Sequence, residues 1–258
     1  MHYIVFDLEF NQAEHPSKDN KSDSDIKCPF EIIQIGAIKL DENLNVIGSF
    51  NRLVNPQVYR ELNKYVKAIT NLTIEALNNA KDFSIVYNEF LNFIKGEGCV
   101  LCVWGTVDLK ELIRNVKYHS LDVSSLPKDY IDIQKYATKY LKCPKGTSIG
   151  LQKAIELLEV PLEHNLHDAY NDAYYTAEVF RKIFDKSIKP KKYETYRRKS
   201  SNKEKYKVDT ESMYFQFEKM LNRTVTEEEK SIIRLAYMMG KTNQFLIESP
   251  NKGSKNNS

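Results

Sequence analysis

The chain has 258 residues, of which 41% are hydrophobic and 28% are charged, and its net charge at pH 7 is +3. These fractions are typical of soluble globular proteins and exclude collagen-like and largely disordered chains. Because no apolar run approaches the ~20 residues of a membrane span and the N-terminus has no basic region or cleavage site, we predict a cytoplasmic protein with no membrane contact.

The first part of the chain is predicted to form three strands. Residues 3–10 alternate around β-branched and aromatic side chains, and residues 31–40 and 46–54 have the same character. A polar stretch at 11–27, rich in Ser, Asp, Asn and Lys, separates the first two strands as a loop. Since consecutive strands with short connections pair antiparallel, the sheet is predicted to begin as an antiparallel meander.

After the meander the apolar spacing changes to that of helices. Helix starts are predicted at 71–73, at Ser84 as an N-cap, and near Asp108, the last after a buried strand at 99–104. Three further helices are predicted at 131–141, 148–158 and 168–184. A meander followed by alternating strands and helices indicates an α/β fold, in which helices pack on the faces of a mixed sheet.

The C-terminal part differs in charge from the rest of the chain. Residues 186–207, here called the basic segment, contain ten Lys and Arg against two Glu, a net charge of +8. Composition alone favours a solvated linker and a phosphate-contacting segment equally. Two amphipathic helices are predicted at 209–221 and 226–245, the second with Thr226 and Glu229 at capping-box spacing.

These patterns predict a main domain at residues 1–185 and a basic linker at 186–207. They also predict a helical hairpin at 208–248 and a disordered tail at 249–258.

Two acidic residues interrupt the first apolar strand. Asp7 and Glu9 are two residues apart, so both carboxylates leave the same face of the sheet. Side by side they would raise each other's pKa, whereas a divalent cation would accept both in the ionised form. Alone the pair is weak evidence for a metal site, because strand ends often carry solvated acids.

Two later motifs add a third carboxylate and a fourth. Asp108 follows the strand–glycine sequence Trp104-Gly105 at the start of a helix, where it could also be a capping residue. His167 and Asp172, five residues apart, lie at the start of another helix and could likewise belong to a capped helix start.

The three motifs together resemble those of the DEDDh 3′-to-5′ exonucleases, the superfamily of RNase T and of the proofreading subunit of replicative DNA polymerase. The resemblance rests on the order D-x-E, W-G-x-x-D and H-x-x-x-x-D, and it covers roughly residues 1–185. Residues 29–37, 55–56 and 150–161 match as well. The W-G-x-x-D form is most similar to the KapD-like exoribonuclease branch.

This resemblance implies an RNase H-like fold and two-metal hydrolysis of phosphodiesters, with two Mg²⁺ or Mn²⁺ ions per site. It implies that Asp7 bridges both ions, that Glu9 and Asp172 complete one site, and that Asp108 supports the second through water. His167 is then the general base, to which its ordinary pKa near 6.5 is suited. The expected substrate is a single strand of RNA or DNA with a free 3′ end, and the product is a nucleoside 5′-monophosphate.

Several alternatives stay open at this point. His164 also precedes an acid, although at a spacing of four residues rather than five. No residue separates RNA from DNA, so a proofreading or repair exonuclease is an alternative to an RNA exonuclease, and a binding module without turnover is a weaker one. Within the basic segment, contacts to the nucleic-acid backbone are predicted for Lys191, Lys192, Arg197, Arg198 and Lys199. The sequence does not identify a protein partner.

Overall fold

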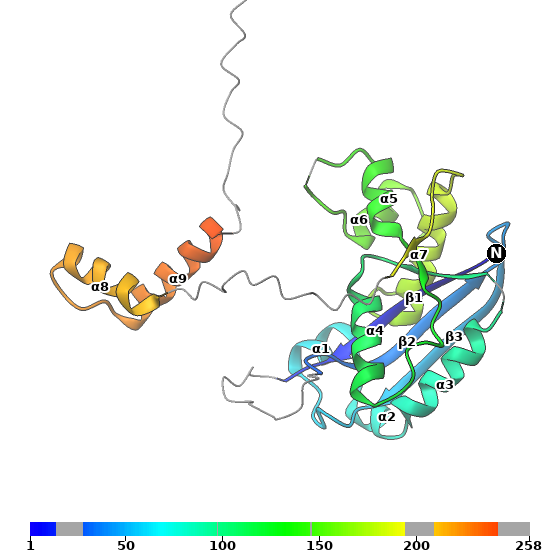
Figure 1. Ribbon diagram of the computed structural model, residues 1–258, viewed down its shortest axis with the longest axis horizontal. Helices are drawn as coiled ribbons and strands as arrows, with labels where there is room; N and C mark the ends of the chain where they lie inside the picture. The colour runs from blue at the N-terminus through cyan, green and yellow to red at the C-terminus, as the bar shows by residue number, and fades with distance from the viewer. Residues whose placement is uncertain (14–27, 97, 145, 194–208, 242–258) are drawn as a thin grey trace, which may run out of the picture. The chain divides into compact units, whose positions relative to one another are not determined.

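The computed structural model describes residues 1–13, 28–96, 98–144, 146–193 and 209–241 (Figure 1). The chain forms two compact units, which divide after Thr195. Most of the predicted loop at 11–27, the tail, and Arg197, Arg198 and Lys199 lie outside the described residues. Within the described ranges, no helix combines the length and the apolar character that a membrane crossing needs.

The first unit is built on a seven-stranded sheet with the strand order β4-β3-β2-β1-β5-β6-β7. The strands are β1 (His2–Asn11), β2 (Glu31–Leu40), β3 (Val46–Asn55), β4 (Lys81–Asp82), β5 (Cys99–Val103), β6 (Asp129–Asp132) and β7 (Lys191–Lys192). The first three strands pair antiparallel, as predicted, while β5 runs parallel to β1 and β6 runs parallel to β5. The prediction of a mixed sheet is confirmed.

Helices cover both faces of this sheet (Figure 1). They are α1 (Lys64–Thr70), α2 (Ile74–Asn78), α3 (Phe83–Ile94), α4 (Val107–Tyr118), α5 (Ile133–Tyr140), α6 (Leu151–Leu157) and α7 (Ala169–Ile183). Neighbouring residues of β1 point into different cores: Ile4 packs with α3 and α4, whereas Val5 packs with α5, α6 and α7. This period of two is why β1 is apolar along almost its whole length, since both of its faces are buried.

Three details of the predicted helices are wrong. Ser84 lies inside the first turn of α3, and the N-cap is Asp82, because the chain is already extended there as β4. The helix predicted from residue 131 begins at Ile133, since residues 129–132 pair with β5 as β6. Helix α1, which is only seven residues long, has no predicted counterpart and is capped by the side chain of Asn63.

Gly36 is the point at which α7 approaches the sheet most closely. A Cβ atom on Gly36 would collide with backbone atoms of Ala169 and Tyr170. Gly36 pairs with Asp7 across the β1–β2 ladder, so the contact places the first turn of α7 directly over the acidic part of β1. The missing side chain of Gly36 therefore sets the distance between α7 and the carboxylates of β1.

We expect Gly36→Ala to lower the free energy of unfolding by about 3 kcal/mol or more, because the added methyl group meets rigid backbone rather than a side chain that can move. Chemical denaturation would measure the loss. Gly150→Ala is the matched control, since a Cβ atom there has no neighbour within 4 Å. Equal, small losses in the two variants would contradict the close approach of α7.

The start of the basic segment belongs to the first unit. Lys191 and Lys192 form β7, which pairs with Tyr130 and Asp129 of β6, and the Tyr193 N–H donates to the Lys128 carbonyl (2.7 Å). The described start of the basic segment, residues 191–193, therefore packs with the sheet of the first unit.

The second unit contains two helices, α8 (Thr210–Leu221) and α9 (Glu227–Lys241). Its predicted capping box is present: the Glu229 N–H donates to Thr226 Oγ1 (3.2 Å), and the Thr226 N–H donates to the Glu229 carboxylate (2.9 Å). The Tyr214 ring of α8 packs under the cations of Lys230 and Arg234 on α9. The two helices therefore contact each other as a hairpin.

Candidate active site

Three carboxylates meet where β1 passes beneath the first turn of α7. One oxygen from each of Asp7, Glu9 and Asp172 lies within 4.8 Å of the other two. Asp7 and Glu9 share one face of β1, and Asp172 lies in the first turn of α7. The predicted pairing of the D-x-E motif with the third motif is thus present in the geometry.

Asp108 approaches the same cluster from α4. It is the second residue of that helix and is only 8% exposed, and the N-cap position belongs to Thr106. Asp108 is therefore not the capping residue. Its charge contributes to raising the pKa of both Asp7 and Glu9, which places it close to the cluster although outside the group of three.

The four carboxylates disfavour one another's ionised forms. Burial, followed by the charges of Asp108 and Asp172, holds the pKa of Asp7 well above its ordinary value. Burial and the charge of Asp172 raise the pKa of Glu9 to about 8. Burial also raises the pKa of Asp108 to about 7 and that of Asp172 to about 6. Positive charge within the site would stabilise the ionised forms of these carboxylates.

The donor set fits a hard divalent cation. Mg²⁺ and Mn²⁺ take oxygen ligands, and every side chain of the cluster offers carboxylate oxygens. In addition, Asp172 Oδ1 is buried and has no hydrogen-bond partner among the residues that the structure describes. A buried carboxylate oxygen without a partner is costly in a folded protein unless it binds a cation.

His167 lies beside Asp172 with an unusual backbone conformation. Its φ of 66° is in the left-handed region, which side chains other than glycine seldom adopt. The His167 N–H approaches Asp172 Oδ2 (3.4 Å), and the charge of His167 lowers the pKa of Asp172 against the effect of burial. The exposed His167 is therefore adjacent to the carboxylate cluster, as its predicted role requires.

His164 lies in a different environment. Its backbone N–H donates to the Tyr175 hydroxyl (2.7 Å), which donates in turn to the His164 carbonyl (3.2 Å). Its ring packs edge-on against Tyr174. These contacts fix the loop that leads into α7.

Gln34 is a site residue that the sequence analysis did not single out. Its side-chain amide N–H groups donate to Asp168 Oδ2 (2.8 Å) and to Asn51 Oδ1 (3.0 Å). Its carbonyl oxygen accepts from the Ala169 N–H (3.3 Å). Gln34 thus ties β2 to the residue that caps α7 and so positions His167 and Asp172. An amide within the otherwise apolar residues 32–38 was the available signal.

Of the predicted nucleic-acid contacts, the two that the structure describes, Lys191 and Lys192, lie on the edge strand β7. Lys192 pairs with Asp129 of β6, and Lys191 pairs with Tyr130. Tyr130 pairs in turn with Leu101 of β5. Because successive side chains of a strand leave opposite faces, the two lysines point in different directions.

Known proteins share both the sequence and the fold of the first unit. The RNase T family model, which describes exonucleases, matches residues 4–180. A PolC-type DNA polymerase III of Caldanaerobacter subterraneus is 28% identical over 184 residues, which are 71% of this chain. The chain spans only 12% of the length of that relative.

Two solved structures show the fold in other exonucleases. The nuclease domain of 3′hExo, a DEDDh family member bound to rAMP, has a TM-score of 0.61 at 18% identity, covering 75% of this chain and 96% of that domain. Exonuclease I of E. coli, in complex with a dT13 oligonucleotide, has a TM-score of 0.55 at 16% identity, covering 70% of this chain and 40% of that protein. The family model matches more than half of the chain, and the order of the three motifs agrees with that match. The chain therefore belongs to the RNase T family within the DEDDh 3′-to-5′ exonuclease superfamily.

Proposed function

We propose that this protein is a metal-dependent 3′-to-5′ exonuclease that releases nucleoside 5′-monophosphates from single-stranded nucleic acid, with RNA as the preferred strand. The observation that carries the proposal is the meeting of Asp7, Glu9 and Asp172 within 4.8 Å, beside Asp108 and next to His167. The weaker alternative, a binding module without turnover, is disfavoured because all five positions are present.

Asp7, Glu9 and Asp172 would hold one divalent ion, and Asp7 with Asp108 would hold a second. When bound, such ions stabilise the charge that develops on the attacking and leaving oxygens of the phosphodiester. The raised pKa values of the cluster support this assignment, since a cation is what allows the four carboxylates to be ionised together.

His167 would remove the proton from the attacking water. Its exposed position beside Asp172 leaves the ring accessible to solvent, and the left-handed backbone holds it at the entrance of α7. Gln34 would act as a positioning residue, because it contacts Asp168 and Ala169 rather than the substrate.

The preference for RNA is the less supported part of the proposal. It rests on the resemblance of W-G-x-x-D to the KapD-like branch, and the 3′hExo neighbour, which was solved with rAMP, is compatible with it. The relatives among PolC-type DNA polymerases favour the second candidate, a DNA exonuclease of the proofreading or repair type.

The deciding experiment incubates matched RNA and DNA strands, labelled at the 3′ nucleotide, with Mg²⁺ or Mn²⁺ and separately with a chelator. We expect metal-dependent release of labelled mononucleotide, faster from RNA. Release that is unaffected by the chelator would overturn the metal assignment, and faster degradation of DNA would overturn the RNA assignment.

A further prediction concerns the basic segment, which we propose contacts the substrate backbone. In the full-length protein, replacing Arg197, Arg198 and Lys199 with Gln is expected to reduce the log–log salt slope of strand binding by about 2, since each phosphate contact on a single strand contributes about 0.7. Fluorescence anisotropy over a salt series measures the slope. An unchanged slope would leave these residues as part of a solvated linker.

A further inference from the structure

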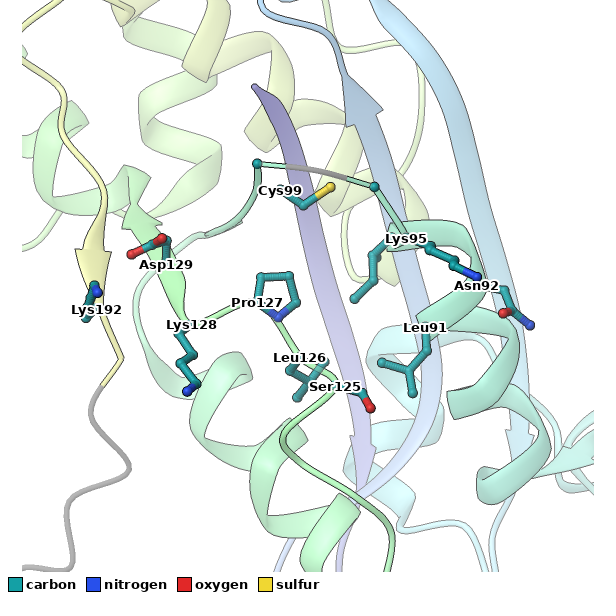
Figure 2. A pocket seen from close by; sticks show the side chains of 13 residues that line it. Leu91, Asn92, Lys95, Cys99, Ser125, Leu126, Pro127, Lys128, Asp129 and Lys192 are labelled. Atoms are coloured by element: carbon teal, nitrogen blue, oxygen red, sulfur yellow. The ribbon is translucent and has the colours of Figure 1, made fainter.

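Two adjoining cavities form a groove at the end of the sheet where β5 begins. The first, of about 740 Å³, lies between the last turn of α3, the loop 125–128 and β7, and Figure 2 shows it with Lys128 and Lys192 on one side and Lys95 on the other. The second, of about 510 Å³, lies between α4 and the same loop. Both are lined by Leu126, Pro127 and Lys128, so we treat them as one feature, the rear groove.

The rear groove is rich in unpaired positive charge. Lys95, Lys128 and Lys192 line the first cavity, and Lys117 lines the second beside Lys128. Among the described residues, these four lysines have no hydrogen bond or ion pair through their side chains, and Asp129 is the one carboxylate that lines either cavity. By contrast, Lys81, Arg114 and Arg181 elsewhere on the first unit each have an acidic partner.

The second cavity adds an apolar surface to these charges. Leu109 and Ile113 of α4 form one wall, and Pro127 and Tyr193 lie opposite. Tyr193 is held in place by its backbone bond to Lys128 and by an edge-on contact between its ring and that of Tyr130, at 5.9 Å between centroids. A fixed aromatic ring next to cations is the combination that binds single strands, since every base can stack while the lysines contact phosphates.

Helix α4 connects the rear groove to the candidate active site. Asp108 lies in its first turn and Lys117 in its last, nine residues further along, which corresponds to about 14 Å of helix. At the stacked spacing of about 3.4 Å per nucleotide, this distance corresponds to about four nucleotides. The proposed substrate would have to follow α4 over this distance to occupy both the candidate active site and the rear groove.

We propose that the rear groove binds the part of a single-stranded substrate that lies 5′ of the nucleotide being removed. Lys95, Lys117 and Lys128 contact its phosphates, and a base packs against Tyr193 and Pro127. This inference rests on the proposed exonuclease function. It adds a second set of proposed substrate contacts, which are formed by described residues of the first unit.

The charge of the groove also suits an acidic peptide, but two observations favour nucleic acid. The lysines alternate with an apolar and aromatic surface, which bases use and acidic side chains do not. The second cavity is also lined by Leu109, which follows Asp108 on α4, and by Lys117 in the last turn of the same helix.

The test compares the full-length protein with the variant Lys95→Ala/Lys117→Ala/Lys128→Ala on two substrates. A nucleotide p-nitrophenyl ester carries one phosphodiester and does not reach the groove, whereas a single-stranded 20-mer does. We expect unchanged hydrolysis of the ester, at least a tenfold higher KM for the 20-mer, and a salt slope of 20-mer binding lower by about 2, or 0.7 for each of three contacts.

The control variant Lys139→Ala/Lys142→Ala/Lys182→Ala removes the same charge from exposed positions away from the groove, on and beside α5 and on α7. Equal effects of the two triple variants would attribute the change to net charge and overturn the proposal. Unchanged 20-mer binding in the groove variant would also overturn it, leaving an acidic protein as the fitting ligand. A wild-type protein inactive on both substrates would refute the exonuclease function, and direct 20-mer binding would still test the groove.

Discussion

Asp7→Asn is expected to abolish exonuclease activity while leaving the protein folded. Asp7 is half-buried within the cluster, where the charges of Asp108, Asp172 and Glu9 all act on it. Asn keeps the shape of the side chain but removes the anionic ligand that both proposed ions share. Since metal ions contribute several kcal/mol of charge stabilisation to the transition state, the rate is expected to fall by about 10³-fold or more.

Two measurements separate this loss from unfolding. Without metal, Tm of Asp7→Asn should equal or exceed that of the wild type, because one of four mutually repelling groups is gone. With Mn²⁺ the wild-type Tm should rise, since the metal binds the folded state, and the variant should lose most of that rise.

Asp132→Asn provides the matched control, because Asp132 ends β6 and caps α5 through Lys135, a task that Asn also performs. Near wild-type turnover by Asp7→Asn or by Asp172→Asn in Mg²⁺ or Mn²⁺ would show that the two-metal assignment is wrong.

His167→Ala is expected to lower turnover by about 10²- to 10⁴-fold, the usual contribution of general acid–base catalysis. The rise of Tm on adding Mn²⁺ should persist, because His167 is not among the proposed ligands. Single-turnover rates and thermal scans on the same samples would measure both effects.

The backbone of His167 makes a second variant useful. Its left-handed conformation costs roughly 1–2 kcal/mol for most side chains, so His167→Ala also carries some strain. Asn tolerates that conformation and cannot act as a base, so His167→Asn should lose as much activity with less effect on stability. His164→Ala is the control, and a large loss there with none at His167 would transfer the role to His164.

Local spacing made part of this molecule predictable. The ten-residue strands β1, β2 and β3 are long enough, and rich enough in β-branched and aromatic residues, to be recognised, and the short connection from β2 to β3 favours their antiparallel pairing. The D-x-E pair and the five-residue interval between His167 and Asp172 are also local. By contrast, β4 and β7 have two residues each and β6 has four, which is too short for a period to appear.

Contacts between distant segments were not predictable in this way. Gln34 meets Asp168 across 134 positions of the chain, and Gly36 meets Ala169 across a similar interval. The rear groove joins α3, α4, β7 and the loop 125–128, which adjoin one another only in the folded sheet. Spacing along a sequence reports neighbours within an element, whereas these sites depend on which elements the fold brings together.

The two-residue strand β7 at the edge of the sheet determines where the chain can be truncated without aggregation. An open strand edge presents unpaired backbone groups to other copies, and proteins blunt such edges with short strands and lysines. With only Lys191 and Lys192, β7 covers β6 in this manner. A fragment that ends at residue 185 would uncover β6 with Tyr130 and Ile131 at the margin, and we expect it to aggregate. A fragment that ends at Thr195 keeps β7, and we expect it not to aggregate.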